Sequence, residues 1–315
     1  MQSNHAQQND DHALPVSSDT ADAVSSGAYP ASHTSASAEL NAVYSAQSEM
    51  DEARWLQHYR NNQLNRSEPD WTAPITMTPG QVKVLARSIA QFQLGDGGGP
   101  GCLIAWNAQS FRGNTAGTQE LVDLWFREEK EHSRLLGCLL ARLDGTPISG
   151  HWSFSCFCWV RRVMGVRFEL LALLLTEIAA TIYYKVMRRH TPDAAVRQVC
   201  TLILRDEGGH IAFHRDRMAR AAFEGRASYG WLWEACFRTL GLGAATMLWV
   251  NHARSLCPFG ATTVEYYGEV WREMSTFLRR LRRDARRLKE KSAGTRREAS
   301  AAAQRPNDKP LALGV

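Results

Sequence analysis

Two segments of the sequence repeat one spacing of residues that can bind a metal ion, Glu129-x-x-His132 and Glu207-x-x-His210. On a helix, residues three positions apart lie about one turn apart on the same face, roughly 5–6 Å between their Cβ atoms. A carboxylate and an imidazole at that separation can bind one divalent ion together. The spacing therefore predicts a metal site to which each pair supplies two ligands.

Both pairs occupy positions where a helix would otherwise present apolar side chains to the core. Steps of three and four residues through the first pair give Val122, Trp125, Glu129, His132, Leu136, Leu139 and Leu143. The same steps through the second pair give Val196, Cys200, Ile203, Glu207, His210 and His214. Burying a carboxylate without a partner is costly, so an opposite charge or a metal ion should compensate each one.

A third carboxylate, Glu177, lies in an apolar segment on one face with Leu173, Ala180 and Tyr184. Two facing Glu-x-x-His pairs can hold two ions, and carboxylates from other helices would complete their coordination. We therefore expect Glu177 to be a ligand as well.

An acid directly precedes each glutamate of the two pairs, Glu128 before Glu129 and Asp206 before Glu207. A histidine that binds a metal usually donates its other ring N–H to such an acid. Two roles remain open, because each acid also has an arginine beside it in the sequence and could lie on the helix surface. These arginines are Arg127 and Arg205.

His214 continues the core face one turn beyond His210, and Gly208 and Gly209 lie between the ligand-type residues. His214 could be a further ligand, but we expect a hydrogen-bonded core histidine. Each glycine in a helix interior costs about 0.8–1 kcal/mol relative to alanine. The pair therefore predicts that a neighbouring element or ligand approaches this helix closely.

The elements around these residues are expected to be helices, and no strand is expected between them. Helical periodicity predicts four core segments, at about 79–110, 118–143, 163–189 and 192–222. Thr78-Pro79 and Thr191-Pro192-Asp193 are typical helix starts. Further helices follow Tyr229, ending with one near 263–291. Its expected apolar seam is Trp271, Met274, Leu278, Leu281, Ala285 and Leu288.

The composition divides the chain into four parts. The first 50 residues hold ten Ala and ten Ser but no Trp or Phe, which predicts a disordered segment. We expect a helical bundle over residues 51–255, a basic helix over 256–291 and a flexible tail over 292–315. Residues 279–297 carry ten Lys or Arg against two acids, although the chain as a whole is only +5. We interpret this stripe as a solvated face, because no aromatic residues interleave it, and binding to nucleic acid is not expected.

No secretory signal and no membrane span are expected. The start lacks a basic stretch followed by an apolar one, which favours the cytoplasm. The most apolar run, from Leu170 onward to Tyr184, is shorter than a membrane span and carries Glu169 and Glu177. Seven scattered cysteines indicate reduced thiols, and Cys156-Phe157-Cys158 is interpreted as a pair of ordinary buried thiols.

The metal-binding pattern resembles that of ferritin-like di-iron carboxylate proteins. Their bundles supply a Glu from each of two helices and a Glu-x-x-His pair from each of the other two. The resemblance covers roughly residues 85–255 and includes Glu177 followed by Asp206-Glu207-x-x-His210. Ser88-Ile89-Ala90-Gln91-Phe92-Gln93-Leu94-Gly95 is also similar to the opening of a bacterial ferritin-like domain family. The resemblance implies an all-α, ferritin-like four-helix bundle with extra C-terminal helices. The metal ligands that it implies are Glu129, His132, Glu177, Glu207 and His210.

The first helix departs from the family pattern. Relatives supply a Glu where this chain has Asp96 within the sequence Leu94-Gly95-Asp96-Gly97-Gly98-Gly99-Pro100-Gly101. We expect Asp96 to be the missing ligand, carried on a helix that the glycines and Pro100 kink or break. A phosphate-binding loop is not favoured, because no strand or lysine flanks the glycines.

The activity implied by the resemblance is that of a non-haem di-iron oxidoreductase. Two iron ions, or alternatively manganese, would activate O2 to oxidise a small organic substrate. The sequence does not identify the substrate, the electron donor or the oligomeric state. Iron or peroxide handling, as in ferritins and rubrerythrins, is an alternative, although rubredoxin-like Cys-x-x-Cys pairs are absent from the sequence. Another is a metal-free helical scaffold that binds a partner, and metal content would separate it from the others.

Overall fold

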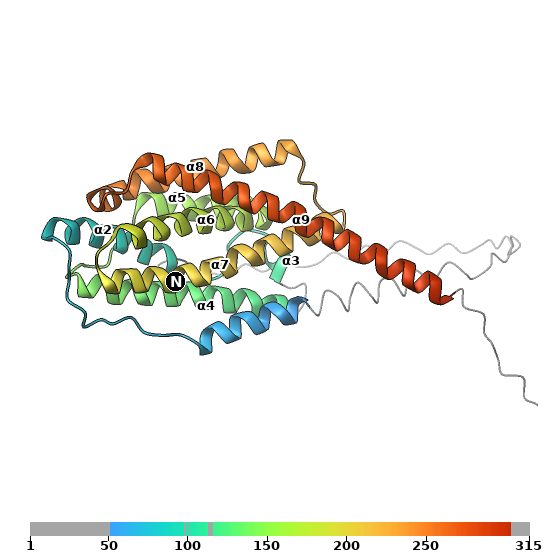
Figure 1. Ribbon diagram of the computed structural model, residues 1–315, viewed down its shortest axis with the longest axis horizontal. Coiled ribbons are helices and arrows are strands. Elements are labelled where there is room, and N and C mark those ends of the chain that lie inside the picture. Colours follow the sequence, from blue (N-terminus) through green and yellow to red (C-terminus); the bar gives the residue numbers. More distant parts are fainter. Residues whose placement is uncertain (1–50, 98, 100, 113–115, 304–315) are drawn as a thin grey trace, which may run out of the picture. The chain divides into compact units, whose positions relative to one another are not determined.

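The computed structural model describes residues 51–97, 99, 101–112 and 116–303, and these residues form helices and no strands (Figure 1). They belong to one compact unit that begins at Glu49. The expected all-α fold is therefore confirmed. The disordered segment expected over residues 1–50 lies outside the described residues.

A helical segment over residues 51–64 precedes the labelled helices. The elements that follow are α2 (Pro79–Gly97), α3 (Ala108–Arg112), α4 (Ala116–Arg142), α5 (Trp152–Val163), α6 (Val166–His190), α7 (Ala194–Phe223), α8 (Trp231–Leu256), the 3-10 helix η1 (Cys257–Phe259) and α9 (Thr263–Ala303).

Four long helices pack against one another around the predicted ligands. α2 packs against α4, α4 against α7, and α7 against α6. α8 contacts both α2 and α6, whereas α9 runs along α7 and α6 (Figure 1). Because each of α2, α4, α6 and α7 carries predicted ligands on a buried face, this packing directs those residues toward one interior region.

Two helix starts show how the sequence sets the helix ends. The backbone N–H of Gln81 donates to Thr78 Oγ1 (3.3 Å), and the Thr78 N–H donates to Gln81 Oε1 (3.0 Å). This reciprocal capping box confirms the start of α2. α7 begins later than expected, because Asp193 rather than Thr191 is its cap and accepts from the Val196 N–H (3.1 Å).

α2 ends at Gly97, well before the expected residue 110. A Cβ atom at Gly97 would lie 2.1 Å from Ser133 Oγ on α4, so only glycine permits this approach of the two helices. The close approach places Asp96, the preceding residue, next to α4. The rest of the expected first helix is a loop and the short α3.

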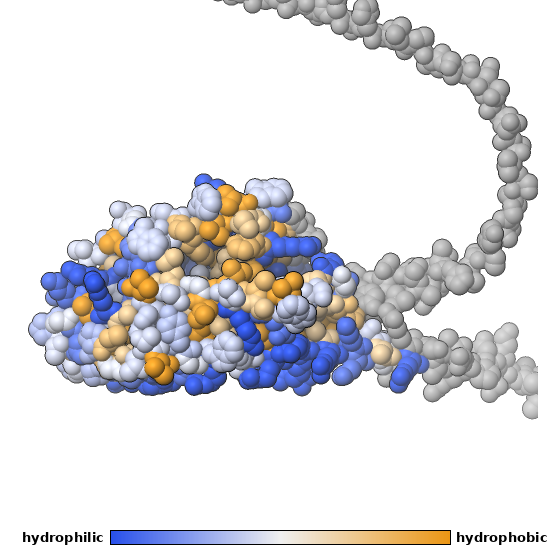
Figure 2. Space-filling model, turned by 90° about the horizontal axis from the view of Figure 1, so that it is seen from above, coloured by the Kyte–Doolittle hydropathy of each residue, from blue (hydrophilic) through white to orange (hydrophobic). Residues whose placement is uncertain are grey.

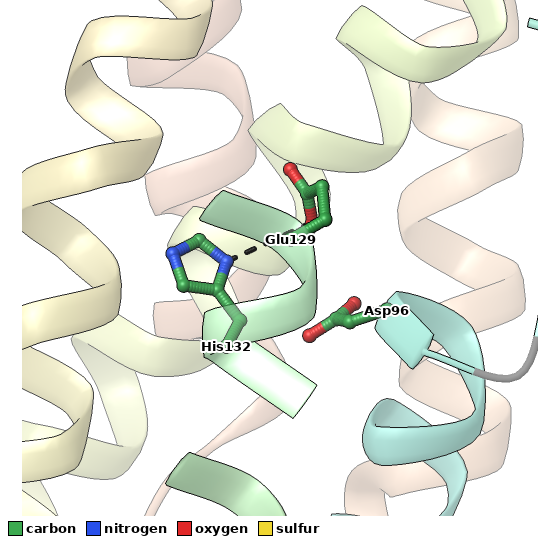
Figure 3. A group of neighbouring side chains, drawn as sticks. All are labelled: Asp96, Glu129 and His132. Carbon is green, nitrogen blue, oxygen red and sulfur yellow. Dashed lines mark ion pairs between the residues drawn. The ribbon is translucent and has the colours of Figure 1, made fainter. Parts of the chain in front are cut away.

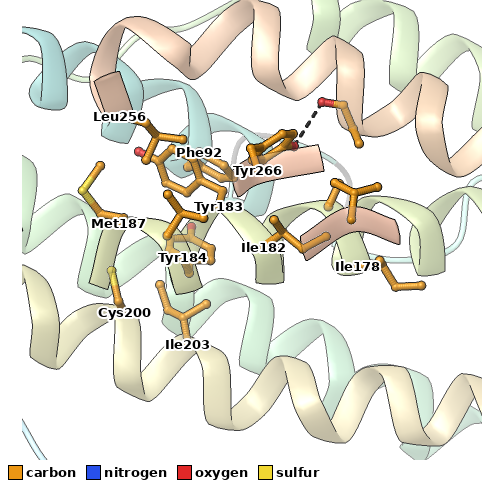
Figure 4. Close-up of a cluster of buried hydrophobic side chains, with 14 of the residues drawn as sticks. Phe92, Ile178, Ile182, Tyr183, Tyr184, Met187, Cys200, Ile203, Leu256 and Tyr266 are labelled. Carbon is orange, nitrogen blue, oxygen red and sulfur yellow. Dashed lines mark hydrogen bonds between the residues drawn. The ribbon is translucent and has the colours of Figure 1, made fainter. Parts of the chain in front are cut away.

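The apolar core lies between α2, α4, α6, α7, α8 and α9, and Figure 4 shows part of it. Tyr183 and Tyr184 of α6 are both fully buried here. Ser88 Oγ lies 2.7 Å from Tyr183 OH and 2.7 Å from His252 Nδ1, so one hydroxyl links α2, α6 and α8. Both tyrosines are therefore part of the packed core.

α9 is longer than expected and runs on to Ala303, past residue 291. Met274, Leu278 and Leu281 of its seam are buried, but Trp271 is exposed and lies against Arg238. The arginines of its basic stripe, such as Arg279 and Arg286, are exposed, as expected of a solvated face.

The surface of α8 carries several exposed apolar side chains. Seen from the side on which α8 and α9 lie in Figure 1, apolar and polar residues are intermixed (Figure 2). The exposed apolar residues of α8 include Trp231, Leu240, Leu242, Met247 and Val250. Among the described residues, α6 alone is long and apolar enough to cross a membrane, and most of its apolar stretch is buried, as in a core helix.

Candidate metal centre

The structure brings the predicted ligands together from four helices. Glu129 and His132 come from α4, Glu207 and His210 from α7, Glu177 from α6 and Asp96 from α2. Glu129 lies near both histidines and is the residue that the two candidate groups described below share. His210 Nδ1 lies 3.1 Å from Glu129 Oε1, and His132 Nδ1 lies 3.7 Å from Glu129 Oε2.

Two overlapping groups of these side chains could each hold a metal ion. One consists of Asp96, Glu129 and His132, and the other of Glu129, Glu207 and His210. In each group the potential ligand atoms lie within 4.8 Å of one another. Figure 3 shows the first group, in which Asp96 at the end of α2 points toward α4. The expected placement of Asp96 beside Glu129 and His132 is therefore observed.

Glu177 lies on the other side of the second group. Its Oε1 atom is 4.0 Å from His210 Nδ1, and its Oε2 atom is 3.5 Å from His214 Nε2. Glu177 is nearly fully buried, at 7 % exposure. It therefore adds a carboxylate to the part of the cluster formed by α7.

Several buried ligand atoms have no hydrogen-bond partner among the described residues. They are His132 Nδ1, His210 Nδ1, Glu207 Oε2 and both carboxylate oxygens of Glu177. Buried polar atoms are normally satisfied, and leaving one without a partner costs about 1–3 kcal/mol. His132, His210 and Glu207 belong to the two candidate groups described above, where bound metal ions would supply partners for them.

The second nitrogen of each histidine is held by an acid from the opposite helix. His132 Nε2 donates to Asp206 Oδ2 of α7 (3.3 Å), and His210 Nε2 donates to Glu128 Oε2 of α4 (2.9 Å). Both acids have fully buried side chains. The sequence left open whether these acids lie on the helix surface or contact a histidine, and the structure shows that they contact the histidines. Because each acid contacts Nε2, Nδ1 of each ring remains available to bind a metal.

Arg66 connects these two acids and was not foreseen from the sequence. It follows the helical segment 51–64, and its Nη1 atom lies 2.9 Å from Asp206 Oδ2. Its Nη2 atom lies 3.4 Å from Glu128 Oε1. Arg205 also pairs with Asp206, at 3.0 Å, whereas Arg127 hydrogen bonds to Gln63. One guanidinium therefore neutralises part of the charge of both acids.

The helical segment 51–64 packs directly over α7 at the site. A Cβ atom at Gly209 would lie 2.5 Å from His58 Nε2, so the close approach expected from the glycine pair is observed there. Nothing lies within 4 Å of the equivalent atom at Gly208. The fully buried Tyr59 ring lies 6.0 Å from the His210 ring, measured between centroids. This segment therefore shields the cluster from water.

Burial and the neighbouring charges raise the pKa values of three residues of the cluster. Burial lowers the pKa of His132, but its hydrogen bond to Asp206 and the nearby Glu129 carboxylate outweigh burial and raise the pKa to about 10. Burial, together with the nearby Glu129 charge, raises the pKa of Glu177 to about 8 and that of Glu207 to about 7. Protons and metal ions thus compete for the same atoms.

His214 differs from the residues of the two groups. Its Nδ1 atom accepts from Arg217 Nη2 at 3.4 Å, so in the neutral ring Nε2 carries the proton. Burial and the Arg217 charge hold the pKa of His214 well below its usual range. This geometry fits the core histidine that we expected, and the ligand role stays an alternative.

The cysteines lie apart from both groups. All seven are free thiols, in agreement with a reduced state. The expectation of buried thiols at Cys156 and Cys158 is wrong for Cys156, because its side chain is exposed on α5.

No family model, curated protein or solved structure matches this chain. The family resemblance therefore depends on the motifs and on the arrangement described above.

Proposed function

We propose that this protein is a di-metal, most simply di-iron, oxidoreductase of the ferritin-like carboxylate class. The observation that carries the proposal is the convergence of the unpartnered His132 Nδ1 and His210 Nδ1 atoms on Glu129. Both rings have the orientation expected of metal ligands, because their Nε2 atoms already donate to buried acids.

The charges of the donor set match two divalent ions. Asp96, Glu129, Glu177 and Glu207 can carry four negative charges, which would balance the four positive charges of two such ions. Glu129 belongs to both candidate groups and would be shared between the ions. Ferrous iron and manganese bind well to carboxylates and imidazoles, which make up this donor set. Zinc and copper often use thiolate ligands, and neither candidate group contains a cysteine.

When bound, two ferrous ions would supply the electrons that O2 needs to oxidise a small organic substrate. The chain would contribute geometry and protection from water. Glu128 and Asp206 would fix the two histidine rings, while Tyr59 and Trp125 would keep the centre dry. Glu177 and Glu207, whose pKa values are raised to about 8 and about 7, would exchange protons during metal binding.

Anaerobic loading with ferrous iron followed by metal analysis tests this proposal. We expect about two iron ions per chain, as in the di-metal bundles, and an absorbance change when the loaded protein meets air. His132→Ala should lower the iron content. His151→Ala is the matched control, because His151 hydrogen bonds to Ser153 and lies outside both groups. Failure of the wild-type chain to retain iron, manganese or any other divalent ion would favour a metal-free scaffold instead.

A further inference from the structure

Arg217 has no carboxylate partner among the described residues, although it lies in the interior near the metal centre. Its Nε atom is sealed from solvent and makes no hydrogen bond. Its one hydrogen bond runs from Nη2 to His214 Nδ1, at a long 3.4 Å. Two neighbouring arginines of α7 behave differently, because Arg215 pairs with Asp284 and Arg220 with Asp216.

A buried cation without a partner is unfavourable, and buried charges in proteins are normally paired. Burial lowers the pKa of Arg217 to about 10, so the guanidinium remains charged at neutral pH. The side chain as a whole is part-buried, which leaves it within reach of a molecule from solution. Arg217 is therefore suited to bind an anion that the chain itself does not provide.

A line of polar groups joins Arg217 to the proposed metal centre. Arg217 contacts His214 Nδ1, and His214 Nε2 lies 3.5 Å from Glu177 Oε2. Glu177 Oε1 in turn lies 4.0 Å from His210 Nδ1. His210, His214 and Arg217 are spaced four and three residues apart, so they share one face of α7.

The surroundings of this line are apolar. Phe213, one turn before Arg217, belongs to a buried cluster with Trp125, Leu170 and Leu173. Trp125 also packs edge-on against the His214 ring, with 5.0 Å between centroids. The side chains next to Arg217 and His214 are therefore largely hydrocarbon or aromatic.

We propose that Arg217 binds the carboxylate of a monocarboxylic acid with an apolar body, and that this acid is the substrate class of the metal centre. The assignment to a substrate rests on the function proposed above. A planar carboxylate matches the guanidinium fork through two parallel hydrogen bonds. A phosphate is disfavoured, because one arginine would have to balance a second negative charge close to Glu177.

Octanoate binding to the full-length protein tests the inference. Calorimetric titration would be carried out on the metal-free protein and on the zinc-loaded protein, in which no redox chemistry occurs. We expect octanoate to bind both forms, and Arg217→Met to weaken binding at least about tenfold. Arg215→Met is the matched control and should leave the affinity unchanged. Octanol, which lacks the charge, should bind wild-type and Arg217→Met protein equally.

Three results would overturn the inference. They are no octanoate binding to wild-type protein, equal binding by wild-type and Arg217→Met protein, and inorganic phosphate binding tighter than octanoate through Arg217. Should Arg217→Met fail to fold by circular dichroism, Arg217→Lys would replace it, since it keeps the charge but loses the fork and should bind more weakly. Arg217-dependent octanoate binding by a chain that takes up no metal would support the carboxylate site while contradicting the di-metal function.

Discussion

Each histidine of the metal centre performs two tasks with its two ring nitrogens. Nε2 donates to a buried acid on the facing helix, and Nδ1 faces the ligand carboxylates. The arrangement is crossed, because the acid preceding each ligand glutamate holds the histidine of the other pair. Glu128 and Asp206 therefore fix the rings of His210 and His132 and connect α4 with α7.

Removing the negative charge of either acid should weaken metal binding. For Glu128→Gln and Asp206→Asn we expect about 10–100-fold lower metal affinity, the usual effect of losing a partner of a ligating histidine. Anaerobic titration with ferrous iron, followed by calorimetry, would measure it. Glu131→Gln is the control, because Glu131 lies on α4 but pairs with Arg134. Unchanged affinity in both variants would mean that the acids do not orient the rings.

At the scale of the elements, the helices that carry ligands were predictable and the segment that covers them was not. Glu129, His132, Glu207 and His210 interrupt long apolar seams, so their periodicity revealed both the helices and the inward direction of the side chains. Arg66 follows a short helix and reaches acids more than 60 residues away in the sequence. No periodic pattern marks such a contact, because it depends on how distant elements pack.

The covering segment should contribute to metal binding through Arg66. In Arg66→Met, Glu128 and Asp206 lose their shared guanidinium, and the two carboxylates repel each other more strongly. We expect metal affinity to fall about tenfold or more, with helical content unchanged by circular dichroism. Arg60→Met, altered in the same segment, should behave like the wild type, because Arg60 pairs with Glu120 on the surface. Equal losses in both variants would point to a general effect on the segment rather than to the acids.

The end of α2 carries Asp96, whose proposed role as a metal ligand can be tested directly. Asp96 stands where the ferritin-like pattern proposed above would have a longer Glu, and it reaches the site because Gly97 lets α2 approach α4. In Asp96→Ala, the ion flanked by Glu129 and His132 would lose one carboxylate. We expect the metal content to fall from about two ions per chain toward one, as the di-metal arrangement requires. An unchanged metal content would mean that another residue, such as His214, or water completes the site.

At the scale of the whole molecule, the buried cluster links stability to both metal and protons. The chain carries a net charge of +5, yet its interior holds several carboxylates beside two histidines. In the metal-free protein, protons neutralise part of this charge. His132 has a pKa raised to about 10 and Glu177 one raised to about 8, so the folded protein binds protons that the unfolded chain would release near neutral pH.

The stability of the metal-free protein should therefore fall as the pH rises from 7 to 9. In the unfolded chain a histidine with a pKa near 6.5 and a glutamate near 4.3 have lost their protons in this range. Folding then takes up protons, so each proton bound only in the folded state lowers the stability by about 1.4 kcal/mol per pH unit. The lowered pKa values of His214 and His252 affect the stability only below about pH 6.5, which is outside this pH range.

Thermal unfolding followed by circular dichroism should show the melting temperature of the metal-free protein decreasing between pH 7 and 9. The metal-loaded protein should show a smaller decrease, because the metal has already displaced these protons. A metal-free protein that becomes more stable over the same range would contradict the protonated state of the cluster.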